Sequence, residues 1–154
     1  MTETLRPFQA ADLEALHALV ARTIETSYAG VYGRSAIDHF HSHHSAEQIG
    51  KDAEAGFTLV AERAGRLVGT GTVVEEHIGR MYVDPEHQGR GLGRRILAAL
   101  EQRARDAGRE SVYLGASLPA RTFYERLGYT LVREDAHEFA DGTRLVWFRM
   151  IKRL

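Results

Sequence analysis

Apolar and polar residues follow two different periods along this chain, and the changes between them divide it into structural elements. From Asp12 apolar residues recur every three or four positions, which is typical of one face of a helix, and the pattern stops near Gly30. Residues 31–45 have no regular period and are rich in histidine, so we expect irregular structure there. The segment Ser45–Gln48 has the spacing of a capping box and predicts a short helix that ends near Gly56.

Short apolar runs bounded by turn residues predict strands. One short strand stops at Pro7, and three further runs cover residues 57–62, 67–74 and 78–83. The connections between these three runs are only a few residues long, which favours antiparallel pairing of neighbouring strands.

Helices and strands alternate in the second half of the chain. An amphipathic pattern from Leu92 to Gly108 predicts a helix, and residues 111–116 predict a strand. Ser117 is the expected N-cap of a further helix, which has a proline in its first turn and runs to about Leu127.

The last two predicted strands, about 129–138 and 143–152, flank Asp141-Gly142, a dipeptide typical of hairpin turns. The complete order is β-α-α-β-β-β-α-β-α-β-β. This order predicts an α+β fold of the three-layer type, with a mixed, mostly antiparallel seven-stranded sheet flanked by helices. The helix between the strands at 78–83 and 111–116 makes that pair locally parallel.

Length, charge and composition exclude several classes of protein. The 154 residues suit a single domain that spans residues 1–154. A net charge of −1 argues against a nucleic-acid partner, and the absence of cysteine excludes disulfides, thiolate metal sites and a cysteine nucleophile. The sequence shows neither a secretory signal nor an apolar run of about 18 residues, so we expect a cytoplasmic protein without a membrane partner.

A glycine-rich turn, Gln88-Gly89-Arg90-Gly91-Leu92-Gly93, joins a predicted strand to an amphipathic helix. Its glycines allow the backbone to approach a ligand closely, and the free amides at the start of the helix attract an anion. The neighbouring arginines add positive charge, so the turn suits a pyrophosphate. Spacing alone is equally compatible with a plain loop whose glycines serve tight turning.

Two common phosphate-binding loops do not fit this turn. A dinucleotide fingerprint that starts at Gly89 needs glycine at position 94, which is arginine here. A Walker A loop needs Gly-Lys-Ser/Thr, which is absent. We therefore expect a phosphate-bearing ligand other than NAD or a nucleotide held by a P-loop.

The pattern Gln88-x-x-Gly91-x-Gly93 is followed downstream by the segment Ala120–Tyr129, which contains a Phe-Tyr pair. Together with the Met-Tyr-Val-Asp-Pro sequence before the turn, these segments resemble the two signatures of the GNAT N-acetyltransferase family. The predicted element order is also similar to that family's fold across nearly the whole chain. The resemblance implies acetyl-CoA as the co-substrate and no metal.

The resemblance also implies which residues hold acetyl-CoA. Its pantetheine arm is expected to bond to the main chain at Met81–Val83, beside a V-shaped gap toward the strand at 111–116. A backbone amide there would donate to the thioester oxygen, where negative charge grows during acyl transfer. Ser117 stands where many members have asparagine, which shortens its reach toward the pantetheine. The implied cofactor-binding residues are Met81, Tyr82, Val83, Gln88, Gly89, Arg90, Gly91, Leu92, Gly93, Arg94, Ser117 and Phe123.

Acetyl transfer to nitrogen needs a proton acceptor and a proton donor. A free alkylammonium has a pKa near ~10.4 and must lose a proton before its nitrogen attacks, whereas the leaving thiolate gains one. The resemblance implies that Tyr124 is the general acid. The alternative for Tyr124 is a helix tyrosine that packs against the sheet.

Glu75, Glu76 and His77 precede the Met-Tyr-Val strand, where many family members carry an acid or lead a chain of waters. We expect His77 or Glu76 to act as the general base, and a solvated turn is the alternative for all three residues. Strand alternation puts Glu75 and His77 on the same face as Met81 and Val83, unless a bulge intervenes.

Four histidines crowd the segment His39–His44, which is the most unusual composition in the chain. If the segment is helical, histidines three or four residues apart share a face and have the spacing of a zinc site. The chain has no HExxH motif and no cysteine, so we expect the segment to border the acceptor cleft instead, with a solvated loop as the alternative. His137 and Glu138 are further candidates near the acceptor.

These features predict an N-acetyltransferase that moves the acetyl group of acetyl-CoA to a primary amine of a small molecule or peptide, by direct attack in a ternary complex. A non-catalytic acyl-CoA-binding module and a histidine-based metal-binding protein are the alternatives. Polyamines, aminoglycosides, amino acids, peptide termini and lysine side chains are all open as acceptors. The last predicted hairpin, with Val146, Trp147 and Phe148, is compatible with a homodimer or with a monomer that buries it.

Overall fold

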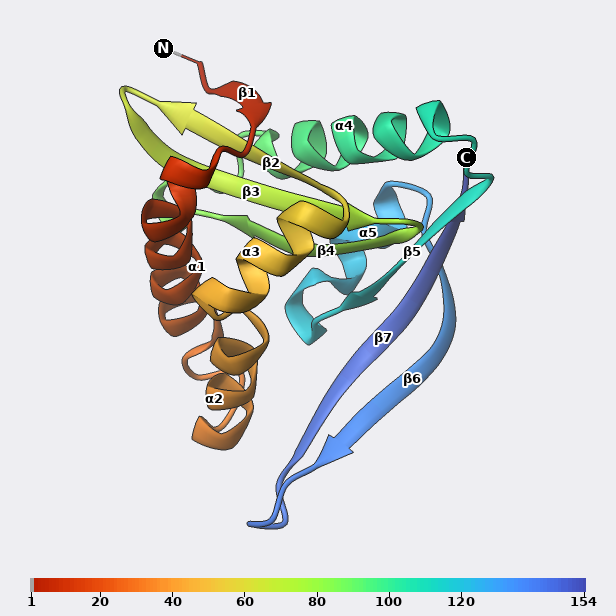
Figure 1. Cartoon of the computed structure of the whole chain (residues 1–154). Helices are drawn as coiled ribbons and strands as arrows, with labels where there is room; N and C mark the ends of the chain where they lie inside the picture. The colour runs from red at the N-terminus through yellow and green to blue at the C-terminus, as the bar shows by residue number, and fades with distance from the viewer. Residues whose placement is uncertain (1) are drawn as a thin grey trace.

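A computed structural model describes residues 2–154, which form one mixed sheet of seven strands with helices on both faces (Figure 1). The strand order is β1-β2-β3-β4-β5-β7-β6, and every neighbouring pair is antiparallel except β4 and β5. The predicted mixed, mostly antiparallel seven-stranded sheet is therefore confirmed. The strands are β1 (Thr4–Pro7), β2 (Phe57–Arg63), β3 (Arg66–Val74), β4 (His77–Val83), β5 (Ser111–Ala116), β6 (Thr130–Glu138) and β7 (Arg144–Arg153). The helices are α1 (Leu13–Tyr28), α2 (Arg34–His43), α3 (Ala46–Ala55), α4 (Leu92–Asp106) and α5 (Arg121–Arg126).

Two hydrophobic cores lie on opposite faces of the sheet (Figure 1). On one face α1 and α3 cover Val60 and Tyr82, and on the other face α4 covers Val68 and Ile78. The buried side chains of α1 and α4 recur at helical spacing, because each helix needs one apolar stripe toward the sheet. The periodicity in the sequence therefore reflects this sandwich of a sheet between two helix layers.

Helix α2 occupies a segment where we expected irregular structure, so that expectation is wrong. The helix begins after Gly33 and buries only Ala36 and Ile37, with Phe40 partly buried beside them. A helix of ten residues with so few apolar positions leaves little periodicity to detect. Apart from Phe40, its other positions are polar or histidine.

Strand β4 contains a bulge, because Arg80 and Met81 both oppose Gly71 of β3. Arg80 adopts the left-handed backbone conformation, with a φ of 50°. The extra residue reverses the alternation of side chains along the strand. As a result Ile78, rather than His77, packs in the same core as Met81. The expectation that His77 shares a face with Met81 is therefore wrong.

The parallel strands β4 and β5 pair only at their beginnings. His77 is opposite Tyr113, the Tyr113 amide donates to the Glu76 carbonyl at 2.9 Å, and no further pair follows along the two strands. The helix α4 connects β4 to β5, as the sequence predicted. Beyond His77 the strands diverge and leave a gap in the middle of the sheet.

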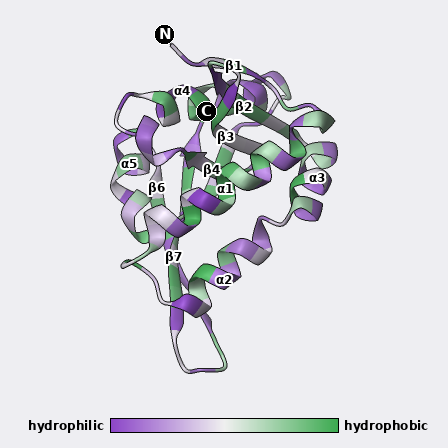
Figure 2. Cartoon of the chain, turned by 90° about the vertical axis from the view of Figure 1, so that its left-hand side faces the viewer, coloured by the Kyte–Doolittle hydropathy of each residue, from purple (hydrophilic) through white to green (hydrophobic). Residues whose placement is uncertain are grey.

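The long hairpin of β6 and β7 extends away from the body of the sheet toward α2 (Figures 1 and 2). Ser35 of α2 donates a hydrogen bond to Asp141 at the hairpin turn, with 2.5 Å between the two oxygens. Helix α2 and the hairpin thus stand side by side next to the gap. Within residues 2–154, no helix has the length and apolar character required to span a membrane.

Candidate active site

The turn after β4 is anchored at its first residue, Asp84, whose side chain is almost completely buried. Its carboxylate accepts hydrogen bonds from the Glu86 amide at 3.0 Å and from Arg22 of α1 at 2.8 Å. Burial by itself would raise the pKa of Asp84, but these donors hold the pKa below its usual value. The ionised Asp84 therefore ties the turn to α1.

The glycine-rich turn presents an open backbone surface. The side-chain amide of Gln88 donates to the Val83 carbonyl at 2.9 Å, so Gln88 closes the turn upon the end of β4. Gly89 and Gly91 adopt left-handed φ values of 78° and 83°, and a Cβ at either position would have no atom within 4 Å. Gly91 is the N-cap of α4, whose first amides have no partner inside the helix. These amides are available to an anion.

A groove of about 890 Å³, which we call the loop groove, runs between the end of β4, the turn, the start of α4 and α5. Of the predicted cofactor-binding residues, only Arg90 does not line it, and the Arg90 side chain is exposed to solvent. The predicted residues that line the groove are Met81, Tyr82, Val83, Gln88, Gly89, Gly91, Leu92, Gly93, Arg94, Ser117 and Phe123.

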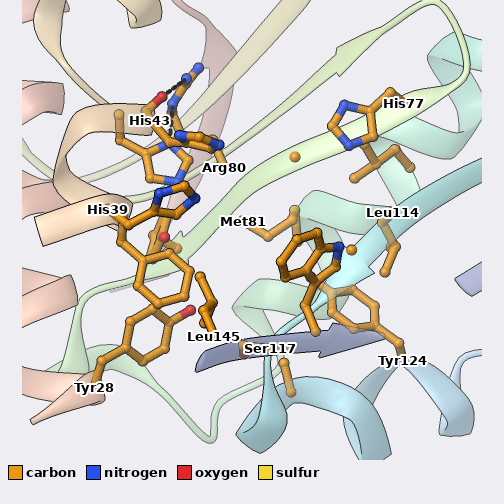
Figure 3. A pocket seen from close by; sticks show the side chains of 18 residues that line it. Tyr28, His39, His43, His77, Arg80, Met81, Leu114, Ser117, Tyr124 and Leu145 are labelled. Carbon is orange, nitrogen blue, oxygen red and sulfur yellow. Dashed lines mark hydrogen bonds between the residues drawn. The ribbon is translucent and has the colours of Figure 1, made fainter. Parts of the chain in front are cut away.

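A second cavity of about 350 Å³, which we call the inner cavity, lies between α2, β4, β5 and β7. Figure 3 looks into this cavity, with Tyr28, His39 and His43 on one side and His77 and Leu114 on the other. The cavity thus fills the gap that opens where β4 and β5 diverge, and the histidine-rich α2 forms one of its walls.

The two cavities share a set of lining residues, so they are two arms of one site. The shared residues are Tyr28, Met81, Tyr82, Ser117, Ala120 and Tyr124. Both signatures of the sequence contribute to this junction, one through β4 and the other through α5. A long ligand in the loop groove and a small one in the inner cavity would meet at these residues.

Tyr124 stands at the junction with its side chain 7% exposed. Its hydroxyl makes no hydrogen bond within residues 2–154. The buried side-chain atoms without a partner in that range are Arg80 Nη1 and His87 Nδ1, so the Tyr124 hydroxyl faces open space. Burial and the nearby Tyr28 raise the pKa of Tyr124 above that of an ordinary phenol. Tyr124 is therefore protonated at neutral pH and is able to donate a proton.

His77 borders the inner cavity at the first residue of β4, where its ring stacks against Tyr113 with 5.0 Å between centroids. Burial of the ring lowers the pKa of His77 below 6.5, and the positive charge of Arg149 lowers it further by a smaller amount. The imidazole is therefore neutral at pH 7 and is able to accept a proton.

Glu76, the other predicted base, lies in the turn before β4 and lines neither cavity. Its carboxylate pairs with Arg109 at 3.2 Å near the start of β5. The structure thus brings His77 to the inner cavity and leaves Glu76 outside it, because Glu76 belongs to the turn and His77 to the strand. His77 is the better candidate for the base.

The histidines of α2 make separate contacts. His39 stacks with His43 and with His137 of β6, at centroid distances of 4.3 and 5.1 Å, and this stack lies where α2 meets the long hairpin. Burial is the main cause that lowers the pKa of His39, and the charges of His43 and His137 lower it further. His41 instead faces Glu25 of α1 at 2.8 Å. Within residues 2–154 no group of three or more potential ligands has the arrangement of a metal site.

Several residues of the site carried no recognisable signal in the sequence. Arg80 is buried at the bulge and donates to His44 at 3.0 Å and to Asp52 of α3 at 2.8 Å. Tyr28 ends α1 and lines both cavities. Ser117 sits at the N-cap position that the sequence predicted, but its side chain makes no capping hydrogen bond. In the sequence, only the Asp-Pro pair at the end of β4 indicated the position of Asp84, which anchors the turn.

Comparison with known proteins places this site in a family. A family model described as an acetyltransferase (GNAT) domain matches residues 25–153. Mycothiol acetyltransferase from Thermomonospora curvata is 36% identical over 120 residues, which cover 69% of this chain and 40% of that protein. Glucosamine 6-phosphate N-acetyltransferase from Trypanosoma brucei brucei is 37% identical over 67 residues, which cover 44% of this chain and 41% of that protein. The chain thus spans less than half the length of these two relatives.

Solved structures agree over the whole chain. A GCN5-related N-acetyltransferase from Rhodopseudomonas palustris has a TM-score of 0.89 with 26% identity and covers 100% of this chain and 97% of its own. PaiA N-acetyltransferase from Thermoplasma acidophilum, solved in complex with coenzyme A, has a TM-score of 0.78 with 19% identity and covers 100% of both chains. Because the family model matches residues 25–153 and the fold agrees with that match, the chain belongs to the GNAT acetyltransferase family.

Proposed function

We propose that this protein transfers the acetyl group of acetyl-CoA to a primary amine of a small molecule or peptide, by direct attack in a ternary complex. The observation that carries the proposal is the meeting of the loop groove and the inner cavity at Tyr124. One arm has a turn suited to an anion at its outer end, and the other offers a space of about 350 Å³ for an acceptor. Two substrates bound at once would place their reacting atoms at the junction.

The loop groove fits the shape and charge of coenzyme A. The left-handed Gly89 and Gly91 leave the helix amides uncovered, and Arg94 adds a positive charge at the groove wall. These groups suit the pyrophosphate of the cofactor. The main chain of Met81–Val83 lies farther along the groove, beyond the single pair that joins β4 to β5, and suits the pantetheine arm. Coenzyme A is present in the solved structure of the PaiA relative.

Tyr124 at the junction and His77 in the inner cavity supply the proton transfers that the reaction needs. His77 accepts a proton from the ammonium form of the acceptor, directly or through water, and the freed nitrogen attacks the thioester carbon. A carbon–nitrogen bond forms, the nitrogen that has become positively charged gives up its second proton to solvent, the carbon–sulfur bond breaks, and the sulfur leaves with the electron pair. Tyr124 donates its proton to that thiolate and is reprotonated from solvent. The neutral imidazole and the protonated phenol are the forms that this sequence of transfers requires.

Replacing Gly91 with alanine is expected to weaken acetyl-CoA binding roughly tenfold, because a left-handed backbone costs a residue with a Cβ about 1–2 kcal/mol. The turn would relax away from the conformation that exposes the helix amides. Isothermal titration of the purified variant with acetyl-CoA measures the change. Gly50→Ala is the control, since Gly50 has an ordinary φ, a Cβ there would meet no atom within 4 Å, and the residue lines neither cavity. Equal losses in both variants would show that the left-handed φ is unimportant.

The lowered pKa of His77 predicts a specific pH dependence. As pH falls through that pKa the imidazole gains a proton and can no longer act as a base, so kcat/KM should fall with an inflection below pH 6.5. His77→Gln should remove this inflection and lower kcat/KM about 100-fold at pH 7. His17→Gln, which changes an exposed histidine of α1 outside both cavities, should keep the wild-type profile. An unchanged inflection in His77→Gln would assign the base to another group.

A further inference from the structure

The inner cavity contains no acidic side chain. Its ionisable lining residues are the tyrosines at the junction, four histidines and Arg80, and none of the residues in 2–154 that line it is aspartate or glutamate. A ligand with several ammonium groups would therefore lose its hydration there without gaining a counter-ion, which is costly in a confined space. The cavity wall thus disfavours polycationic acceptors.

His44 offers a fixed hydrogen-bond donor at this wall. Arg80 Nε donates to His44 Nδ1 at 3.0 Å, which places the remaining ring proton of His44 on Nε2. Burial, then Arg80, lower the pKa of His44 to about 3, so the ring stays neutral. Nε2 has no hydrogen-bond partner within residues 2–154 and is not among the buried atoms that lack one. The Nε2–H group therefore points to open space at a residue that lines the cavity.

The side chain of Arg149 lies on the face of the sheet that borders the inner cavity, and its positive charge has no carboxylate partner within residues 2–154. Arg149 of β7 is opposite Gly115 of β5, and its guanidinium lies 4.1 Å above the Tyr113 ring. Arg149 does not line the cavity itself, but Tyr113 beneath it packs against His77, which does. Asp52, whose negative charge acts on the pKa of His77 in the direction opposite to Arg149, is already held by Arg80 at 2.8 Å.

We propose that the acceptor amine also carries a carboxylate, which accepts a hydrogen bond from His44 Nε2–H in the positive field of Arg149. This inference rests on the proposed acetyl transfer and narrows its acceptor to a small amino acid-like amine. The aromatic rings of Tyr28, Phe40 and Trp147 on the cavity wall favour an apolar side chain on the carbon that carries the amine and the carboxylate. A volume of about 350 Å³ accommodates an acceptor of the size of a single amino acid.

Matched amines test the proposal in the full-length enzyme with acetyl-CoA. L-phenylalanine is compared with phenethylamine and L-leucine with 3-methylbutylamine, because each pair differs only in the carboxylate. Spermidine and kanamycin serve as polycations. We expect kcat/KM to be about tenfold or more higher for the carboxylated member of each pair and lowest for the polycations, since a hydrogen bond to a charged group is worth about 1.5–3 kcal/mol.

Two variants locate the preference. His44→Asn keeps an oxygen that accepts a hydrogen bond from Arg80 but removes Nε2–H. The ratio of kcat/KM for the carboxylated amine to kcat/KM for the decarboxylated amine should therefore fall toward one in each pair. His41→Asn, which changes a histidine outside the cavity, should keep the wild-type ratio. If His44→Asn does not fold, Arg149→Gln should reduce the ratio several-fold. Arg144→Gln is the control for Arg149, because Arg144 is an exposed residue of the same strand.

The outcomes separate this inference from the proposed function. The carboxylate proposal would be overturned if transfer favours the decarboxylated amines or the polycations. It would also be overturned if both variants leave the ratio of kcat/KM within each pair unchanged. Acetyl transfer itself would stand in either case. Binding of acetyl-CoA without transfer to any amine in the panel would overturn acetyl transfer and the acceptor class with it.

Discussion

Replacing Tyr124 with phenylalanine is expected to lower kcat about 100-fold and to leave the affinity for acetyl-CoA within about twofold of the wild type. The phenol stands where the two cavities meet, and its hydroxyl is free of hydrogen bonds within residues 2–154. Burial raises the pKa of Tyr124, which keeps the proton in place until a base forms beside it. The leaving thiolate is such a base, and desolvation in the same site raises the proton affinity of the thiolate as well.

The Tyr124→Phe prediction is checked by steady-state kinetics together with calorimetric titration of acetyl-CoA. Tyr113→Phe is a suitable control, because its hydroxyl borders neither cavity although its ring lies in the same sheet. A kcat close to that of the wild type would remove the general-acid role and assign thiolate protonation to solvent. Parallel loss of kcat and cofactor affinity would instead point to a role of Tyr124 in binding.

Replacing Glu101 with alanine is expected to lower the free energy of unfolding by about 3 kcal/mol. Glu101 of α4 is buried, and its carboxylate accepts hydrogen bonds from Tyr129 at 2.7 Å and from Lys152 of β7 at 3.0 Å. Its removal leaves a buried hydroxyl without an acceptor and a partly buried ammonium without a counter-ion. The contact links α4, the end of the second signature and β7, so the loss affects the whole core on that face.

Thermal and denaturant unfolding measure this loss, which corresponds to a fall in Tm of roughly 6–12 °C for a domain of this size. Gln102→Ala is the control, because Gln102 is exposed and bonds only along its own helix. Combining Glu101→Leu with Tyr129→Phe and Lys152→Met should restore most of the stability, since an apolar set of similar volume needs no partners. A change below about 1 kcal/mol in Glu101→Ala would contradict the account of this network.

The sequence predicted the fold where apolar periodicity is strong. The stripe on α4 and the short runs of β2, β3 and β4 are long enough to specify element type, and the α4 connection specified the parallel pair. Helix α2 was not predicted, because Ala36 and Ile37 are its only fully buried residues. Hydrophobic patterning cannot reveal a helix whose remaining side chains face a cavity or solvent.

The candidate site was predicted where it depends on backbone geometry and missed where it depends on packing. Gly89 and Gly91 signalled the turn, because a left-handed backbone needs glycine there. The bulge at Arg80 left no trace in the sequence, since it arises from the register between β3 and β4. His77 lines the cavity and Glu76, in the turn before β4, does not, and this difference depends on the conformation of that turn, which only the folded chain supplies.

The resemblance to a known family and the contacts of the residues in the structure provide different information about the site. The family signatures brought Gln88 and Phe123 forward as cofactor contacts, and both line the loop groove. The hydrogen bond from Gln88 to the Val83 carbonyl gives Gln88 a further part, the closing of the turn. The wall of the inner cavity that His44 and Arg80 help to form lies outside both signatures.

Acetyl transfer itself is tested most directly by incubating the purified protein with acetyl-CoA and the amine panel, while free thiol and amine mass are followed together. The account predicts that coenzyme A thiol is released in step with an amine product heavier by one acetyl group, and that both signals are lost in Tyr124→Phe. Thiol release without an acetylated amine, or acetyl-CoA binding with neither product, would contradict it.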